Sequence, residues 1–188
     1  LVTGGTGFVG KALVTALLSR GDSVTVLTRS IEKAQAAFPE KTPQFLTALS
    51  ALKDLNTFDA VINLAGEPIF DKKWTVQQKE KLRHSRIDLT QQIVQFINQS
   101  EHPPVLISGS ATGIYGNCGD EQITEHTNPS TQFTAQLCID WENAAQQANA
   151  RVCLVRTGLV LSPKGGAFAK ILPLYRFGLG GKLGNGEQ

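Results

Sequence analysis

Short apolar runs rich in β-branched residues alternate along the chain with longer segments whose apolar positions recur at a helical period. The runs are nearly continuous in apolar residues, as strands are when both faces of their sheet are covered. The pattern predicts strands over 1–3, 24–27, 60–64, 105–107 and 152–155, and a weaker strand near 45–46. It predicts helices over 8–20, 30–38, roughly 75–98 and roughly 134–149.

This alternation is typical of βαβ units, in which helices connect parallel strands of one sheet. We therefore predict the α/β class and, within it, a Rossmann fold: a doubly wound parallel sheet with helices on both faces. Residues 1–160 would form this domain. Beyond it the chain becomes glycine-rich, with seven of its 18 glycines at or after Gly165.

A glycine-rich turn follows the first predicted strand and opens the first predicted helix. Gly4 would permit the tight turn, Gly7 would let the backbone approach a pyrophosphate, and Gly10 would let the helix pack closely on the strand. The helix N-terminus adds N–H donors and a positive dipole end. A turn without a ligand is the alternative, but the strand before it and the helix after it favour a dinucleotide site. Its candidate residues are Gly4, Thr6, Gly7, Phe8, Val9 and Gly10.

The end of the second predicted strand indicates which dinucleotide binds. NAD sites usually carry Asp or Glu there, which would repel the 2′-phosphate of NADP. This chain instead has Thr28, Arg29 and Ser30. We therefore predict NADP(H) as the cofactor, with Arg29 on the 2′-phosphate and Ser30 assisting; the alternative is that Arg29 is a solvated surface residue.

One cation interrupts the apolar stripe of the third predicted helix. Arg86 lies on the line formed by Leu82, Leu89, Ile93 and Ile97, which follow one another at helical spacing. A guanidinium in that position needs an anion. It could pair with a carboxylate or reach water at the edge of the stripe, or it could contact the cofactor or the substrate.

Three further strings carry a resemblance to a known family. They are Asn63-Leu64-Ala65-Gly66-Glu67-Pro68, Ser108-Gly109-Ser110-Ala111-Thr112-Gly113 and Arg156-Thr157-Gly158. With the glycine turn, they resemble the extended short-chain dehydrogenases/reductases, and more narrowly an atypical branch of NAD-dependent epimerase/dehydratase-like proteins.

This resemblance implies that Leu64, Ala65, Gly66, Arg86 and Arg156 also face the cofactor. It further implies that 161–188 begin a small substrate lobe, and that Phe177-Gly178-Leu179-Gly180-Gly181 lead into it.

The resemblance also shows where the usual catalytic set has changed. Ser110 occupies the family's Ser position, but the Tyr and Lys positions fall on Thr134 and Cys138, and the helix Asn aligns with Arg86. A Thr hydroxyl is too weak an acid to replace a phenol. Our hypothesis is that Ser110 and Arg86 polarise a substrate oxygen, with Cys138 or Tyr115 as proton donor.

Each candidate proton donor has a simpler interpretation. We expect Arg86 to lower the pKa of Cys138 towards a thiolate, although Cys138 could instead be a small buried residue beside Trp141. Tyr115 could merely shape a turn. The loop residues Lys72 and Lys73 could bind a nucleotide-sugar phosphate, but a solvated charge pair beside a core Trp74 is the simpler interpretation.

Composition narrows the partners and the compartment. The formal net charge is +2 with no basic run, so the electrostatic footprint of a nucleic-acid or anionic-membrane surface is missing. Three cysteines without ligand spacing indicate reduced thiols and a cytoplasmic protein. We expect a small-molecule substrate, no metal, no nucleic acid and no membrane, and we leave a homodimer open.

The function class follows from these residues. Because the chain opens on Leu1 and contains no Met, we expect a piece of a longer reading frame. We predict an NADP(H)-binding epimerase or oxidoreductase that transfers a hydride on a small polar or nucleotide-linked sugar. The alternative is a non-catalytic NADPH-binding sensor or interaction protein, which the missing Tyr and Lys favour.

Overall fold

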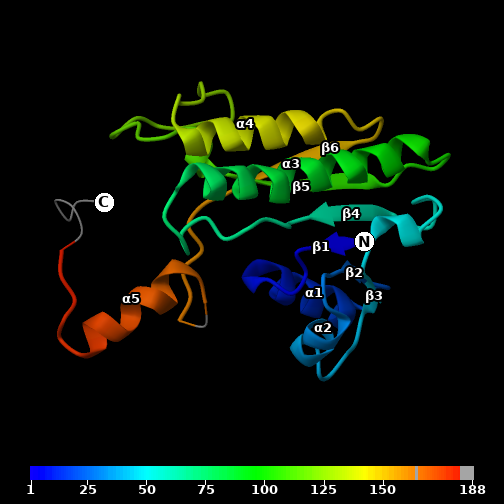
Figure 1. Cartoon of the computed structure of the whole chain (residues 1–188), viewed down its shortest axis with the longest axis horizontal. Helices are drawn as coiled ribbons and strands as arrows, with labels where there is room; N and C mark the ends of the chain where they lie inside the picture. Colours follow the sequence, from blue (N-terminus) through cyan, green and yellow to red (C-terminus); the bar gives the residue numbers. More distant parts are fainter. Residues whose placement is uncertain (164, 183–188) are drawn as a thin grey trace. The chain divides into compact units, whose positions relative to one another are not determined.

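The computed structural model describes residues 1–163 and 165–182 and contains one six-stranded sheet (Figure 1). The order of its strands is β3-β2-β1-β4-β5-β6, and the registered pairs from β3 to β5 are parallel. The strands are β1 (Val2–Thr3), β2 (Thr25–Leu27), β3 (Gln44–Leu46), β4 (Ala60–Asn63), β5 (Val105–Ala111) and β6 (Val152–Thr157). This is the strand order of the predicted doubly wound Rossmann fold. Successive strands are added towards one edge of the sheet from β1 to β3, and towards the other edge from β4 to β6.

Four of the five helices in the described chain connect successive strands of the sheet, and α5 follows β6. The helices are α1 (Phe8–Arg20), α2 (Ile31–Ala37), α3 (Val76–Gln99), α4 (Phe133–Ala145) and α5 (Gly166–Arg176), with short 3₁₀ turns at Leu49–Ala51 and Thr112–Ile114. Local sequence sets their ends: Gly21 at φ +96° closes α1, and the Thr75 hydroxyl accepts from the Gln78 N–H to cap α3.

Alternate residues of the strands enter two different cores, which shows that both faces of the sheet are covered. Val61 packs with Ile93 and Ile97 of α3, whereas its neighbour Ile62 packs with the core around Val14 of α1. Neighbouring side chains of a strand point to opposite faces. Figure 1 accordingly shows α3 and α4 side by side in one layer, with α1 and α2 together elsewhere.

A buried polar chain connects the middle strands to the helices. The Thr3 hydroxyl donates to the side-chain oxygen Oδ1 of Asn63 at 2.7 Å, and the side-chain Nδ2 of Asn63 donates to Thr90 Oγ1 at 2.8 Å. The indole N–H of Trp141 in α4 donates to the same Thr90 oxygen at 3.0 Å. Each of these four side chains has a hydrogen-bond partner, so the network holds β1, β4, α3 and α4 in one arrangement.

The polypeptide divides into two compact units, Leu1–Arg156 and Thr157–Gln188. The second unit contains α5, with Pro173 inside it, and the Tyr175 hydroxyl donates to the Gly181 carbonyl at 2.7 Å. Its glycine content gave no sign of this helix. Our prediction for 161–188 also covers 164 and 183–188, which lie outside the described residues.

Two further observations bear on the composition. All three cysteines are free. Across residues 1–163 and 165–182, none of the helices combines the length and the apolar character needed to cross a membrane.

Candidate functional site

The glycine turn after β1 is packed so tightly that side chains are excluded at two of its positions. Gly4 has φ +67°, and a Cβ there would lie 2.6 Å from the Leu64 carbonyl oxygen. A Cβ on Gly10 would lie 2.2 Å from the Gly4 carbonyl oxygen. At Gly7 a Cβ would lie 3.1 Å from the Gly4 carbonyl oxygen, a tight contact but a less severe one. The close packing predicted at Gly4 and Gly10 therefore has a geometric basis.

The turn places the N-terminus of α1 beside a large cavity, which its N-cap residue lines. Gly7 is the N-cap and provides no side chain, and the first turn of α1 carries no acidic residue. The first amides of a helix lack intrahelical partners and carry its positive dipole end. An anionic group placed here would meet donors and no carboxylate from the first turn of the helix.

The cavity next to the turn has a volume of about 1080 Å³. Eight of the predicted cofactor residues line it: Gly4, Thr6, Gly7, Arg29, Ser30, Leu64, Ala65 and Gly66. Phe8, Val9, Gly10, Arg86 and Arg156 are not among its lining residues, so they could act on a ligand there only from its margins. The residues that follow β1 and those that follow β4 therefore line the same cavity.

The end of β2 contributes a cation without a partner. Arg29 is exposed, and within the described part of the chain it forms neither a hydrogen bond nor an ion pair. Ser30 is the N-cap of α2, and its hydroxyl accepts from the Lys33 N–H at 3.4 Å. Lys33 also lines the cavity, a residue that our sequence reasoning missed although it lies in the first turn after Ser30.

Arg86 is largely buried and has no acidic partner within hydrogen-bonding distance in the described chain. Its Nη1 donates to the Leu82 carbonyl at 3.2 Å and to Ser85 Oγ at 3.4 Å, and its Nη2 donates to the Glu67 carbonyl at 3.1 Å. Its guanidinium carbon lies 5.4 Å from the centroid of the Trp141 ring. Burial lowers the pKa of this guanidinium, but an arginine stays charged in proteins.

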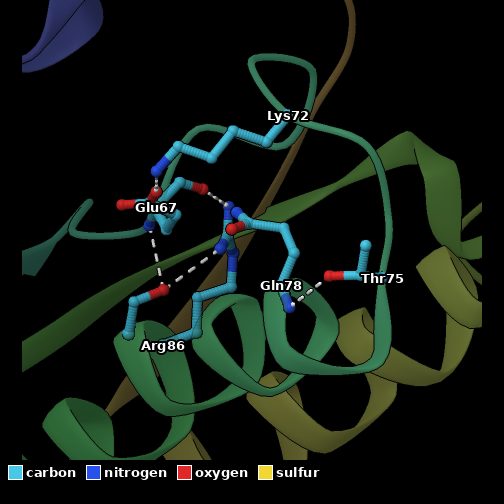
Figure 2. Close-up of polar contacts among 6 residues, drawn as sticks. Glu67, Lys72, Thr75, Gln78 and Arg86 are labelled. Atoms are coloured by element: carbon cyan, nitrogen blue, oxygen red, sulfur yellow. Dashed lines mark hydrogen bonds and ion pairs between the residues drawn. The ribbon is translucent and has the colours of Figure 1, made fainter.

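Glu67 directs its carboxylate away from Arg86 to a lysine of the same loop, between β4 and α3. Lys72 Nζ lies 3.1 Å from Glu67 Oε1, and Figure 2 shows the two side chains meeting above α3. The hydrogen bond from Lys72 is the main reason that the pKa of Glu67 lies below its usual range. Our expectation of a core Trp74 is wrong: this side chain is 41% exposed and donates to the Ile69 carbonyl.

Three of the four catalytic candidates come together at the end of β5 and in α4, but Ser110 is already occupied. Its hydroxyl donates to Glu142 Oε1 at 2.5 Å. Arg156 holds both carboxylate oxygens of Glu142, each at 2.8 Å, and donates to the Tyr115 hydroxyl at 2.7 Å. Our sequence analysis assigned no role to Glu142, so the hydrogen-bond network around this residue was missed.

The charges of this network are well compensated. Burial favours a higher pKa for Glu142, but hydrogen bonds from Arg156 and Ser110 outweigh burial and hold its pKa below the usual range. The hydrogen bond to Glu142 raises the pKa of Arg156. Tyr115 and Arg156 also line a second cavity of about 670 Å³, distinct from the one at the glycine turn.

Cys138 differs from our expectation of a low-pKa thiol. It is 6% exposed and packs with Ile114 and Tyr115. Burial raises the pKa of its thiol, and the charge of Arg86 is the weakest of the opposing influences. The pKa of Cys138 is therefore shifted in the direction opposite to the one that we expected. Any proton transfer from it would have to overcome that burial.

Fold and site together define a class of protein. A parallel sheet with this strand order, a glycine turn at the N-terminus of α1 and a cavity beyond the ends of β1, β2 and β4 are the features of a dinucleotide-binding Rossmann protein. Residues 1–176 match the NAD dependent epimerase/dehydratase family, and the chain belongs to it. This confirms the resemblance found in the sequence.

Several members of known sequence cover the whole chain. An epimerase family protein SDR39U1 homolog, chloroplastic, of Arabidopsis thaliana is 37% identical over 195 residues, which cover 100% of this chain and 56% of that protein. An epimerase family protein of Mycobacterium tuberculosis is 40% identical over 190 residues, covering 100% of this chain and 62% of that protein. The chain thus spans less than two thirds of the length of these relatives.

Two solved structures share the fold closely. The crystal structure of human epimerase family protein SDR39U1 (isoform 2) with NADPH has a TM-score of 0.86 and 31% identity, covering 100% of this chain and 62% of that chain. A nucleoside-diphosphate sugar epimerase from Corynebacterium glutamicum has a TM-score of 0.78 and 34% identity, covering 98% and 38%.

Proposed function

We propose that this chain is the NADP(H)-binding part of an epimerase or oxidoreductase that acts on a small polar, or nucleotide-linked, sugar-type substrate. The observation that carries the proposal is Arg29, a cation that lines the cavity next to the glycine turn and forms no hydrogen bond or ion pair with the described residues. The human relative crystallised with NADPH supports the choice of cofactor. The three free cysteines support a cytoplasmic location.

The residues present suit such a cofactor. The amides that open α1 would hold the pyrophosphate, and the missing side chain at Gly7 leaves room for it. Arg29 and Lys33 would hold the 2′-phosphate, with Ser30 beside them. Leu64, Ala65 and Gly66 would form the wall under the rest of the cofactor. The reduced nicotinamide would supply a hydride to a carbonyl carbon.

The protein's own contribution would be to polarise the substrate oxygen and supply its proton. Arg86, below the Gly66 wall, would stabilise negative charge on that oxygen. Tyr115 and Cys138 are the candidate proton donors, and the Tyr115 hydroxyl accepts a hydrogen bond from Arg156. For Ser110 to donate to a substrate, its hydrogen bond to Glu142 would have to break.

One observation favours a second function, that of a non-catalytic NADPH-binding sensor. Ser110 donates to Glu142 at 2.5 Å, and Cys138 is a buried thiol where the family's Lys would stand. Both groups are occupied or shielded rather than poised for proton transfer. A hydride measurement separates the two functions.

If the protein is an enzyme, deuterium at C4 of NADPH should appear at a carbon of at least one substrate in a broad carbonyl and sugar-nucleotide panel. The full chain would be incubated with the labelled cofactor, and products analysed by mass spectrometry. Transfer that persists in Tyr115→Phe but not in Arg86→Gln would assign the polarising role to Arg86. If NADPH binds and no label leaves it with any compound, the sensor function is favoured.

Arg29→Ala should weaken NADPH binding about 10-fold to 100-fold, because charge-assisted hydrogen bonds to the 2′-phosphate contribute about 1.5–3 kcal/mol. NADH has no such phosphate, so its affinity should not change. Isothermal titration with both cofactors measures the difference, with Lys41→Ala, an exposed lysine outside the cavity lining, as the control. Equal NADPH and NADH affinities in the unmodified protein would overturn the assignment.

A further inference from the structure

Arg86 has donor capacity that the protein does not use. A guanidinium carries five N–H groups, and three hydrogen bonds leave from this one: two from Nη1 and one from Nη2. The Nε–H and one Nη2–H are left without a partner among the described residues. A Cβ on Gly66 would lie 2.8 Å from Cζ, 2.9 Å from Nη2 and 3.1 Å from Nε, so any side chain at position 66 would press against this part of the guanidinium.

A second group near Arg86 is buried without a partner. Gln78 in the first turn of α3 is 6% exposed, and its Nε2 makes no hydrogen bond within the described residues. Figure 2 shows its side chain running from α3 towards Arg86 and Glu67. The Gln78 amide lies near enough to Glu67 to contribute to the lowered pKa of that carboxyl, although the geometry is not that of a hydrogen bond. An orphaned buried amide costs about 1–3 kcal/mol.

Glu67 and Lys72 form the outer boundary of this cluster. The Glu67 side chain is 24% exposed and that of Lys72 59%, so their ion pair lies on the solvent side. Glu67 and Gly66 also line the large cavity, which gives the cluster a route to the bound molecules. The Glu67 side chain can rotate away once its ion pair with Lys72 breaks, because an ion pair on the solvent side contributes only about 0–1 kcal/mol.

We propose that Arg86 and Gln78 form a subsite for an oxyanion, a carboxylate or phosphate group carried by the substrate, which takes the place of the Glu67 carboxylate. This rests on the proposed function, because it assumes that the substrate lies on the Gly66 side of the cavity. Arg86 carries N–H donors only and Gln78 adds its unpartnered Nε2 donor, and donors beside a fixed cation suit an anion. Lys72, released from Glu67, adds a second positive charge.

The test uses the full chain saturated with NADP⁺, so that the glycine turn is already filled and cannot bind the added anion. Inorganic phosphate and acetate are titrated separately at constant ionic strength, and the midpoint of thermal unfolding is recorded. Specific binding raises this midpoint saturably, whereas general salt effects act equally on all variants. Phosphate and acetate distinguish the two possible sources of the oxyanion.

Three variants give the expected pattern a direction. Gln78→Leu should weaken binding roughly tenfold yet keep or raise the midpoint without anion, since it removes an orphaned amide. Glu67→Gln should tighten binding roughly twofold to fivefold, because the competing negative charge is gone. Gln95→Leu, an exposed glutamine on the same helix, should change neither.

The subsite is overturned if neither anion gives a saturable response, if Gln78→Leu responds like the unmodified protein, or if Glu67→Gln weakens binding. A Gln78→Leu protein that unfolds at a much lower temperature without anion would also overturn it, because Gln78 would then be structural. Failure of NADP⁺ to bind would instead refute the proposed function. The same variants, compared in the cofactor-free chain, would then decide the subsite independently.

Discussion

Replacing Glu142 by Gln is expected to lower the free energy of unfolding by about 3 kcal/mol, the lower end of the cost of breaking a buried ion pair. The side chain of Glu142 is only 7% exposed, and both of its oxygens are held by Arg156. The variant leaves the Arg156 cation facing a neutral amide. The Arg156 side chain is 24% exposed, so water can solvate the guanidinium and reduce the loss of stability. Urea denaturation of both proteins measures the difference.

The same pair predicts a pH dependence. The pKa of Glu142 is lowered in the folded protein, so its contribution to stability is full above the ordinary carboxyl pKa, about 4.3. The contribution is lost as the pH falls through the folded pKa. Glu142→Gln should therefore lose less stability than the unmodified protein over that acid range.

Asp88→Asn is the control for this pair. Asp88 pairs with His84 on the surface of α3, with side-chain exposures of 52% and 69%. It should cost less than about 0.5 kcal/mol. An effect of Glu142→Gln as small as this would show that the network around Ser110 does not stabilise the fold.

Gly10→Ala and Gly7→Ala should separate stability from cofactor binding. The Cβ at position 10 would meet the Gly4 carbonyl oxygen at 2.2 Å, and backbone cannot move aside easily. We expect a net loss of at least about 2 kcal/mol, even though alanine gains about 1 kcal/mol over glycine in a helix. NADPH binding should be lost with the shape of the turn.

Gly7→Ala should behave differently, because its Cβ would meet only one backbone atom, at 3.1 Å. The stability loss should be about 1 kcal/mol or less, typical of a changed N-cap. NADPH affinity should fall about 10-fold to 100-fold as the methyl group enters the space of the pyrophosphate. Thermal unfolding and cofactor titration of both variants provide the measurements. Unchanged NADPH affinity in Gly7→Ala would place the cofactor elsewhere.

The elements that the sequence predicts best are those whose pattern is local. The helix at 8–20 has the predicted bounds, and the strand at 60–64 is β4, one residue shorter. The strand predicted at 105–107 continues to Ala111 in the structure. The prediction ended too early because Ser108 and Ser110 alternate with small residues and lack the apolar signal of a strand. The α5 helix was missed because the glycines around it indicated loops.

The candidate site divides in the same way. The glycine turn and Arg29 are readable because one motif and one strand end carry them. The Glu142–Arg156 pair joins α4 to β6, and Gln78 meets Glu67 across a loop. No periodicity within a single element reports such contacts. Arg86 was visible as a polar exception to an apolar stripe and by its alignment with the family's helix Asn, but its contact with Trp141 required the structure.

The floor of the glycine turn comes from a distant part of the chain. Gly4 rests against the Leu64 carbonyl, and the Thr3 hydroxyl bonds to Asn63, 60 positions further on. Contacts between distant segments form slowly, because the intervening loop must close first. During synthesis, therefore, the turn cannot be completed until β4 has emerged from the ribosome. The glycine turn must therefore wait for β4 before it can hold a nucleotide.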